Sequence, residues 1–288
     1  MMRDISSPYM TPRVGVALNE RNAVDDGKLY ETLQSTDVLE LLLHPDCTVP
    51  SVYSSFLQQW KGPLRLHISP RIKGFDQFND VQDELHTTMR YLTGAQGHSL
   101  DALVTHPFSR DAPLDEFTAY IAALRKAGAL IEIENGTPYD SKNDVSGHLY
   151  EAFSQMSELA AYLSSSDLHG DVKVVLDVGK WAEENLIHSP DMEAFPLYET
   201  IQRYDVLIRS LHLCEKRYTH QPGPLKTISI NEGGCIGTGD GIHRLVSTPV
   251  RNYIIETNEM PGNLLEDIKA VRCGLYSMGG VALSKELR

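Results

Sequence analysis

The strongest constraint on the fold of this chain is a repeated alternation between short apolar runs and longer segments with helical periodicity. The apolar runs are VGVAL (14–18), VLELLL (38–43), LRLHI (64–68), ALVTH (102–106), LIEIE (130–134), VKVVLD (172–177), RSLHL (209–213) and YIIE (253–256). Each has the length and composition of a β-strand. Between them, the segments 115–128, 148–165 and 263–278 place apolar residues at intervals of three and four, as amphipathic helices do.

Eight strands that alternate with helices in a chain of 288 residues predict an α/β fold, a (β/α)8 TIM barrel formed as a single domain over residues 1–288. The competing architecture is a doubly wound sheet, which often carries a glycine-rich phosphate-binding turn after its first strand. The corresponding turn here reads NERNAVDDG (19–27) and lacks that pattern. The sequence therefore favours the barrel.

Charge and composition narrow the classes of partner. The chain carries 39 acidic and 26 basic residues, a net charge of −13, which disfavours binding to a nucleic-acid backbone. No apolar run approaches the ~20 residues of a membrane span, and the segment MMRDISSPYMTPR has no apolar signal core. Cys47, Cys214, Cys235 and Cys273 form no CxxC pair, which favours reduced thiols. We expect a cytoplasmic protein with a small-molecule substrate and no nucleic-acid or membrane partner; a homo-oligomer is left open.

Imidazole and carboxylate side chains recur at the ends of the predicted strands. They are His67, His106, Glu134, Asp177, His212 and Glu256. Each alone has an ordinary explanation as a hydrogen-bonded or solvated residue, but active sites of such barrels are built at the carboxyl ends of the strands. Carboxylates gathered there would repel one another unless a cation lay between them. The joint pattern predicts one divalent ion per chain, of Mn, Co, Mg, Zn or Fe.

Five short motifs, in order along the chain, together resemble the xylose-isomerase-like barrel superfamily. They are IEIENG (131–136), VLDVGK (175–180), LHLCEKR (211–217), GTGDG (237–241) and IIETN (254–258). This superfamily includes sugar isomerases and epimerases, dehydratases and the endonuclease IV group. The resemblance implies that Glu134, Asp177, His212 and Glu256 bind the metal, and that Glu134 and Glu256 also move protons. His67 and His106 fall where the endonuclease-like branch has further metal ligands.

The chain departs from this resemblance at three positions. Lys180 stands three residues after Asp177, where the family often has His. Ser229 and Asn231 align with an Asp-x-His pair of the endonuclease-like branch. The loss of three ligands would dismantle a trinuclear site and leave a mononuclear site intact. Together with the negative charge, these departures disfavour DNA cleavage of the endonuclease IV kind.

Two roles, one functional and one structural, are open for several polar residues near the predicted site. We assign His67, His106, Lys180 and Arg217 to substrate binding, although Lys180 also fits a solvated residue that opens a helix and Arg217 an exposed loop residue. The loop 233–241 fits either an anion site or a turn with Asp240 as helix cap. Glu40 points either into the barrel or outward.

The function expected from these residues is that of a divalent-metal-dependent isomerase or epimerase. Its substrate would be a sugar, polyol or related hydroxy-carbonyl compound that reacts through an enediolate, with Glu134 and Glu256 as acid and base. The alternatives are a dehydratase-type lyase, an oxidative enzyme with two or three irons, and a non-enzymatic barrel scaffold.

Overall fold

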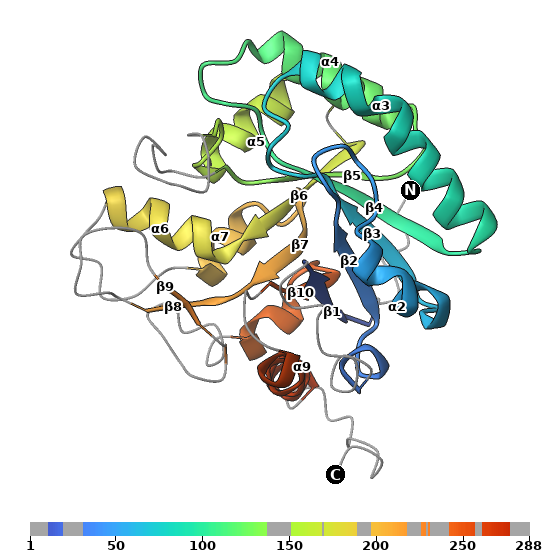
Figure 1. Cartoon of the computed structure of the whole chain (residues 1–288). Helices are drawn as coiled ribbons and strands as arrows, with labels where there is room; N and C mark the ends of the chain where they lie inside the picture. The colour runs from blue at the N-terminus through green and yellow to red at the C-terminus, as the bar shows by residue number, and fades with distance from the viewer. Residues whose placement is uncertain are drawn as a thin grey trace, which may run out of the picture.

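The computed structural model describes residues 11–19, 31–136, 151–168, 170–188, 197–217, 226–228, 230, 242–256 and 261–276. In this part of the chain eight parallel strands close into a barrel, in the order β1-β10-β7-β6-β5-β4-β3-β2 (Figure 1). The strands are β1 (Arg13–Leu18), β2 (Val38–Leu42), β3 (Pro63–His67), β4 (Ser99–Thr105), β5 (Ile131–Glu134), β6 (Val172–Asp177), β7 (Ile208–Leu213) and β10 (Asn252–Ile255). The (β/α)8 barrel and all eight predicted strands are confirmed. The single-domain extent 1–288 stays a prediction.

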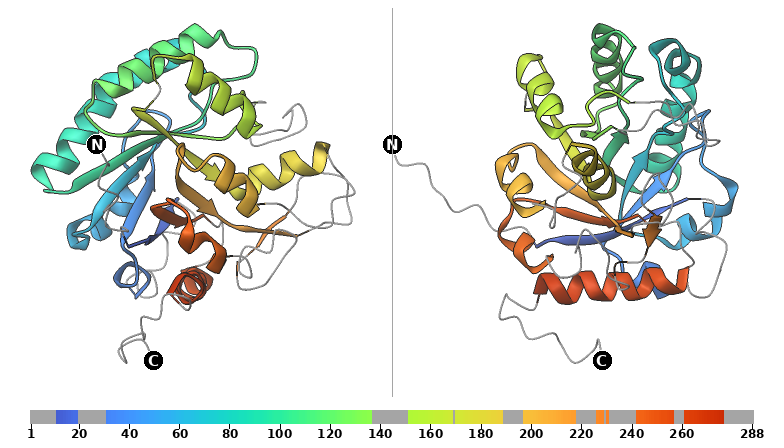
Figure 2. Two further views of the ribbon diagram at one scale, coloured as in Figure 1. Left: turned by 180° about the vertical axis from the view of Figure 1, so that it is seen from behind. Right: turned by 90° about the vertical axis from the view of Figure 1, so that its left-hand side faces the viewer.

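Helices cover the outside of the barrel (Figures 1 and 2). The α-helices are α2 (Ser54–Gln59), α3 (Phe75–Arg90), α4 (Leu114–Arg125), α5 (Met156–Ser165), α6 (Val178–His188), α7 (Leu197–Arg203) and α9 (Pro261–Tyr276). Shorter helical elements are η1 (Ser51–Tyr53), η2 (Tyr91–Ala95) and η5 (Ile242–Ser247), and an antiparallel ribbon joins β8 (Glu215–Arg217) to β9 (Lys226–Ile228). None of the described helices has the length and apolar character needed to cross a membrane.

Two of the three predicted helices are confirmed, and the third is corrected at its start. Helices α4 and α9 lie at the predicted 115–128 and 263–278, whereas α5 begins only at Met156 rather than at 148. Residues 151–155 are not helical because their backbone is fixed to the barrel rim. Ala152 donates to the carbonyl of Phe108 and Gly136 to that of Phe153, whose φ is 56°. Residues 148–150 lie outside the described part.

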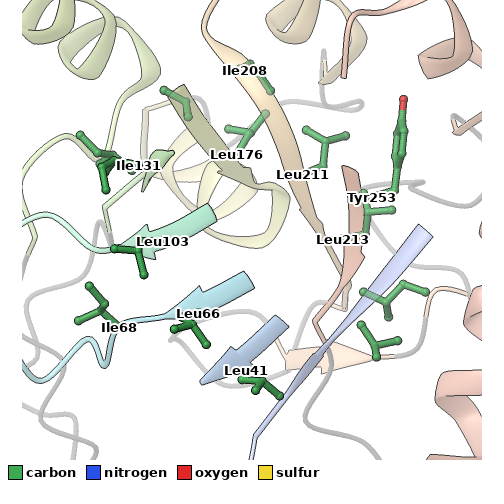
Figure 3. Packing of buried hydrophobic residues seen from close by; sticks show 14 of the residues in the cluster. Leu41, Leu66, Ile68, Leu103, Ile131, Leu176, Ile208, Leu211, Leu213 and Tyr253 are labelled. Atoms are coloured by element: carbon green, nitrogen blue, oxygen red, sulfur yellow. The ribbon is translucent and has the colours of Figure 1, made fainter. Parts of the chain in front are cut away.

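The outer surface of the barrel is apolar and packs against the helices (Figure 3). In β3, Leu64 and Leu66 belong to this buried core, while Arg65 and His67, on the opposite face of the strand, are buried with polar partners. Strand side chains alternate between two faces, which explains the division. The barrel interior is therefore largely polar, in contrast to the branched apolar filling that is common in such barrels.

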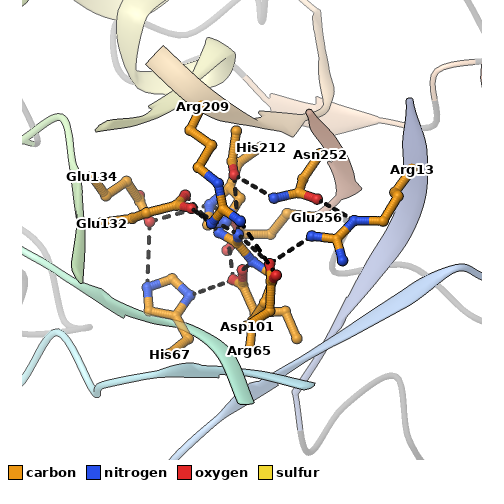
Figure 4. A network of polar contacts seen from close by, with 12 residues as sticks. Arg13, Arg65, His67, Asp101, Glu132, Glu134, Arg209, His212, Asn252 and Glu256 are labelled. Carbon is orange, nitrogen blue, oxygen red and sulfur yellow. Dashed lines mark hydrogen bonds and ion pairs between the residues drawn. The ribbon is translucent and has the colours of Figure 1, made fainter. Parts of the chain in front are cut away.

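Two β-bulges place charged side chains inside the barrel, closer to the amino-terminal ends of the strands. We call this region the floor of the barrel. The pairing of β3 with β4 skips Asp101, and the pairing of β6 with β7 skips Arg209. Asp101 lies 3.3 Å from Arg209 and 2.6 Å from Arg13, and Arg209 lies 2.7 Å from Glu132 (Figure 4). Bulges commonly re-aim one side chain, and here they bring opposite charges from distant strands into one ion-pair layer.

Candidate metal centre

The carboxyl ends of the strands bring five of the predicted site residues together. His67 and Glu134 end β3 and β5, His212 lies one residue before the end of β7, and His106 and Glu256 directly follow β4 and β10. All are buried except Glu256, whose side chain is 40% exposed. The cluster is thus enclosed by protein on its inner side and open at Glu256.

Three of these residues converge on one point. His212 Nδ1 lies 2.8 Å from Glu256 Oε2 and 3.1 Å from Glu134 Oε2 (Figure 4). Within the described residues none of these three atoms has a partner in hydrogen-bonding geometry. Each of the three residues offers a ligand atom within 4.8 Å of the others. Buried polar atoms without partners carry a high energetic cost, and a divalent cation bound between them would satisfy all three.

The electrostatic field at His212 favours a positive charge. Burial alone would lower the pKa of His212, but the carboxylates of Glu40, Glu256 and Glu134 raise it well above its usual value. The same carboxylates would stabilise a metal ion there, in which case the imidazole would bind in its neutral form. Two further groups with metal-ligand spacing share these residues: Glu40 with His67 and His212, and His67 with His106 and Glu134.

Lys180 points into the site rather than into solvent. Its Nζ donates to Glu134 Oε1 and lies 3.2 Å from His106 Nδ1 and 3.9 Å from Glu151 Oε2, and its side chain is 17% exposed. Burial would lower the pKa of Lys180, but Glu134, Glu151 and Asp177 raise it above its usual value. Lys180 therefore lies in the first turn of α6, as a helix-opening residue would, and still directs an ammonium group into the site.

The charge of Lys180 also sets the protonation states of the neighbouring residues. Burial would raise the pKa of Glu134, but the Lys180 ammonium, with His212 as a smaller contribution, holds it well below its usual value. Burial and the Lys180 ammonium lower the pKa of His106 to about 4. At neutral pH, Glu134 is therefore a carboxylate and His106 a neutral imidazole.

Asp177 caps the helix that follows it. Its Oδ1 accepts hydrogen bonds from the backbone N–H groups of Gly179, at 2.7 Å, and Lys180, at 3.1 Å. Asp177 also pairs in register with His212 on the adjacent strand, so its backbone borders the centre. Among the described residues it does not belong to any group with metal-ligand spacing. Its predicted role as a ligand stays a prediction.

The remaining predicted positions lie at the edge of the described structure. Arg217 ends β8, but its side chain lies outside the described part. Ser229, Asn231 and the loop 233–241 with Asp240 lie outside it as well.

Glu40 points into the barrel, where it joins the site to the floor. Its Oε1 lies 2.9 Å from His67 Nδ1, and its Oε2 accepts a 2.8 Å hydrogen bond from Arg65 Nε. Arg65 in turn contacts both carboxylate oxygens of Glu132, at 3.2 and 3.0 Å (Figure 4). The sequence interpretation missed Arg65 and Glu132. Arg65 lies two residues before His67, and Glu132 lies two residues before Glu134. This spacing places each pair on the same face of its strand, which could have identified Arg65 and Glu132 as inward-facing residues.

Glu151 is a site residue that strand periodicity could not identify. It is buried, its Oε1 binds Lys73 Nζ, and the same oxygen lies 3.5 Å from His106 Nδ1. It lies on the non-helical segment before α5, so neither a strand end nor a helix face marks it. An isolated β-bridge between Glu151 and Ser109 holds the backbone in place.

No family model and no curated protein matches this sequence, but solved structures share its fold. Mannonate dehydratase from Streptococcus suis serotype 2 gives a TM-score of 0.60 at 10% identity, over 96% of this chain and 98% of that one. A xylose isomerase domain protein from Alicyclobacillus acidocaldarius gives 0.57 at 13% identity, over 94% and 100%. Endonuclease IV from Thermus thermophilus gives 0.56 at 16% identity, over 92% and 100%. These likenesses show the fold, a (β/α)8 barrel that the chain shares with the xylose isomerase domain protein and the two other structures.

Proposed function

We propose that this protein is a divalent-metal-dependent isomerase or epimerase that acts on a small hydroxy-carbonyl molecule, such as a sugar or a polyol derivative. The observation that carries the proposal is the convergence of Glu134 Oε2, His212 Nδ1 and Glu256 Oε2, three atoms without hydrogen-bond partners among the described residues. They come from three different strand ends at the face where such barrels bind substrates.

The charges around the centre support a divalent ion. Carboxylates at the rim come from Glu134, Glu151, Asp177 and Glu256, whereas the ammonium groups are those of Lys73 and Lys180. With neutral imidazoles, this leaves an excess of two negative charges, which one divalent cation would offset. The ion would be held by Glu134, His212 and Glu256, with Asp177 as the fourth ligand that the resemblance implies.

A bound divalent ion would polarise a substrate carbonyl and acidify the adjacent C–H bond. Glu256 is the more accessible of the two carboxylates, since its side chain is 40% exposed and that of Glu134 only 1%. This exposure supports Glu256 as the base that removes the substrate proton, with the buried Glu134 for the second transfer. Lys180 and His106 lie beside Glu134, where they can donate to substrate oxygens.

A dehydratase-type lyase is the second candidate, and one contact favours it. The Lys180 ammonium holds Glu134 Oε1, which makes Glu134 a weak base and leaves Glu256 as the single accessible one. In a lyase Glu256 would remove the proton and Lys180 would donate to the departing hydroxyl. One of the structures with a similar fold is a mannonate dehydratase. The negative net charge supports a small molecule rather than a nucleic acid in either case.

The test uses protein reconstituted with Mn²⁺ in D₂O and a panel of aldoses, ketoses and sugar acids, followed by proton NMR. Isomerase or epimerase chemistry replaces a C–H beside the carbonyl by C–D, whereas lyase chemistry yields a deoxy-keto product. Glu256→Gln should reduce turnover by about 10² to 10⁴-fold, the usual contribution of a general base. The control is Glu199→Gln on α7, an exposed glutamate paired with Arg244. Equal turnover by Glu256→Gln and wild type would contradict the proposal.

A further inference from the structure

A continuous line of polar contacts runs through the site beside the proposed metal ligands. Lys180 Nζ lies 3.2 Å from His106 Nδ1, His106 Nε2 lies 2.8 Å from His67 Nε2, and His67 Nδ1 lies 2.9 Å from Glu40 Oε1. The two imidazole rings stack at a centroid distance of 4.9 Å. All four ring nitrogens of His67 and His106 therefore have a partner.

The two ends of this line favour one direction of hydrogen bonding. An ammonium group donates and never accepts, so His106 Nδ1 must accept from Lys180. A neutral His106 then carries its proton on Nε2 and donates to His67 Nε2. His67 must therefore carry its proton on Nδ1, where it donates to Glu40, a carboxylate that only accepts.

The opposite direction would create two unfavourable contacts, whereas the first leaves one, between the lone pair of His67 Nε2 and Glu134 Oε2 at 3.3 Å. If His106 Nδ1 donated to Glu151 Oε1, 3.5 Å away, its N–H would also face the Lys180 ammonium. The lone pair of His67 Nδ1 would then face the Glu40 carboxylate at 2.9 Å. Arg65 Nε fixes the other oxygen of Glu40 at 2.8 Å, which keeps that carboxylate in place.

This chain of hydrogen bonds has a consequence for metal binding. His67, His106 and Glu134 have the spacing of a second metal site, because their ligand atoms lie within 4.8 Å of one another. The two imidazoles face Glu134 Oε2, which lies 3.3 Å from His67 Nε2 and 3.9 Å from His106 Nε2, so a second ion would use this oxygen. The proton on His106 Nε2 and its hydrogen bond to His67 Nε2 occupy the two imidazole ligands that this ion would need. We propose that Lys180, acting through His106 and His67 toward Glu40, closes this second site and restricts the centre to the single ion of the proposed function.

Lys180 is a positioning residue in this account, and its removal should open the second site. In Lys180→Met, His106 can carry its proton on Nδ1 and donate to Glu151, which frees His106 Nε2 and His67 Nε2 as ligands beside Glu134 Oε2. The matched control is Lys73→Met, which removes the other ammonium group bound to Glu151 but leaves the contacts of His106 intact. Each variant loses one positive charge near the carboxylate of Glu151.

The first measurement is Co²⁺ titration of the full-length wild-type protein and both variants, followed by absorption spectroscopy. Lys180→Met should bind one equivalent more than wild type, and Lys73→Met should bind the same number as wild type. No gain in Lys180→Met, or an equal gain in both variants, would overturn the inference. A wild-type protein that binds no Co²⁺ would count against the proposed function, while the difference between the variants would still test the closed second site.

The second measurement needs no metal. Two-bond ¹H–¹⁵N correlation spectra of histidine-labelled, metal-free wild-type protein distinguish Nδ1–H from Nε2–H rings, and His67→Gln and His106→Gln assign the signals. His67 should be the Nδ1–H tautomer and His106 the Nε2–H tautomer. The opposite tautomer at either ring would overturn the inference.

Discussion

At the scale of single residues, Asp177 shows how one carboxylate fixes the local fold beside the candidate site. Its Oδ1 caps α6 through the N–H groups of Gly179 and Lys180. The cap also fixes the start of α6, from which Lys180 reaches Glu134. The charge at the strand end is therefore offset by two backbone donors before any cation is considered.

Substitutions at Asp177 separate its capping role from its predicted role as a metal ligand. Asp177→Ala should lower the free energy of unfolding by about 1 kcal/mol through loss of the cap, whereas Asp177→Asn keeps an acceptor and should cost much less. If Asp177 is also a metal ligand, Asp177→Asn should weaken Mn²⁺ binding by at least about tenfold, roughly 1.4 kcal/mol. Chemical denaturation and calorimetric titration measure the two effects. Unchanged Mn²⁺ affinity in Asp177→Asn would restrict this residue to capping.

At the scale of structural elements, the segment before α5 depends on a close backbone approach at Gly136. A Cβ built at Gly136 would lie 2.0 Å from the carbonyl oxygen of Ala152, an atom of the segment that carries Glu151. The segment can therefore reach His106 and Lys73 only because residue 136 has no side chain. This contact links a loop conformation to the charge balance of the site.

Gly136→Ala should displace the Glu151 segment and destabilise the protein by about 1–3 kcal/mol, the usual cost of overpacking. Gly94→Ala is the matched control, since a Cβ there would meet nothing within 4 Å. Thermal unfolding compares the two variants, and the crystal structure of Gly136→Ala should show Glu151 displaced from His106. Equal stability of the two variants would contradict this role of Gly136.

The strand ends and the loops differ in how far the sequence could predict them. The strands were predictable because each is a short apolar run, and the site residues at their ends follow from the topology of the barrel. Glu134 and His212 were found in this way. Glu151 was not, because it comes from an irregular segment whose place depends on Gly136 and on a bridge to Ser109. Lys180 could be placed at the start of a helix, but its direction depends on the cap at Asp177.

At the scale of the whole molecule, the polar interior makes stability depend on pH. Burial alone would raise the pKa of Glu132, but the guanidinium groups of Arg65 and then Arg209 hold it below its usual value of 4.5. The ionised group therefore stabilises the fold above that value, and this stabilisation is lost as the pH falls through the lower pKa of the folded state. The sequence interpretation missed Arg65 and Glu132 because the interior of such barrels is usually filled by apolar side chains.

Glu132→Gln should lower the free energy of unfolding at pH 7 by about 3–5 kcal/mol, because it leaves buried guanidinium charge without its partner. The difference between the free energies of unfolding of the variant and the wild type should narrow as the pH falls below about 4.5. Only the wild type loses the stabilisation by ionised Glu132 in acid. Urea denaturation at a series of pH values measures the difference. A difference that stays constant down to acid pH would contradict the ion-pair role of Glu132.

Anomalous diffraction from crystals soaked in Mn²⁺ shows directly whether Glu134, His212 and Glu256 bind one divalent ion. We expect a single anomalous peak per chain, at about 2.0–2.2 Å from His212 Nδ1 and from Oε2 of both glutamates. His67 and His106 should keep their hydrogen-bonded positions without a peak between them. A peak between His67 and His106, or no peak at the three predicted ligands, would contradict a single ion held by these three residues.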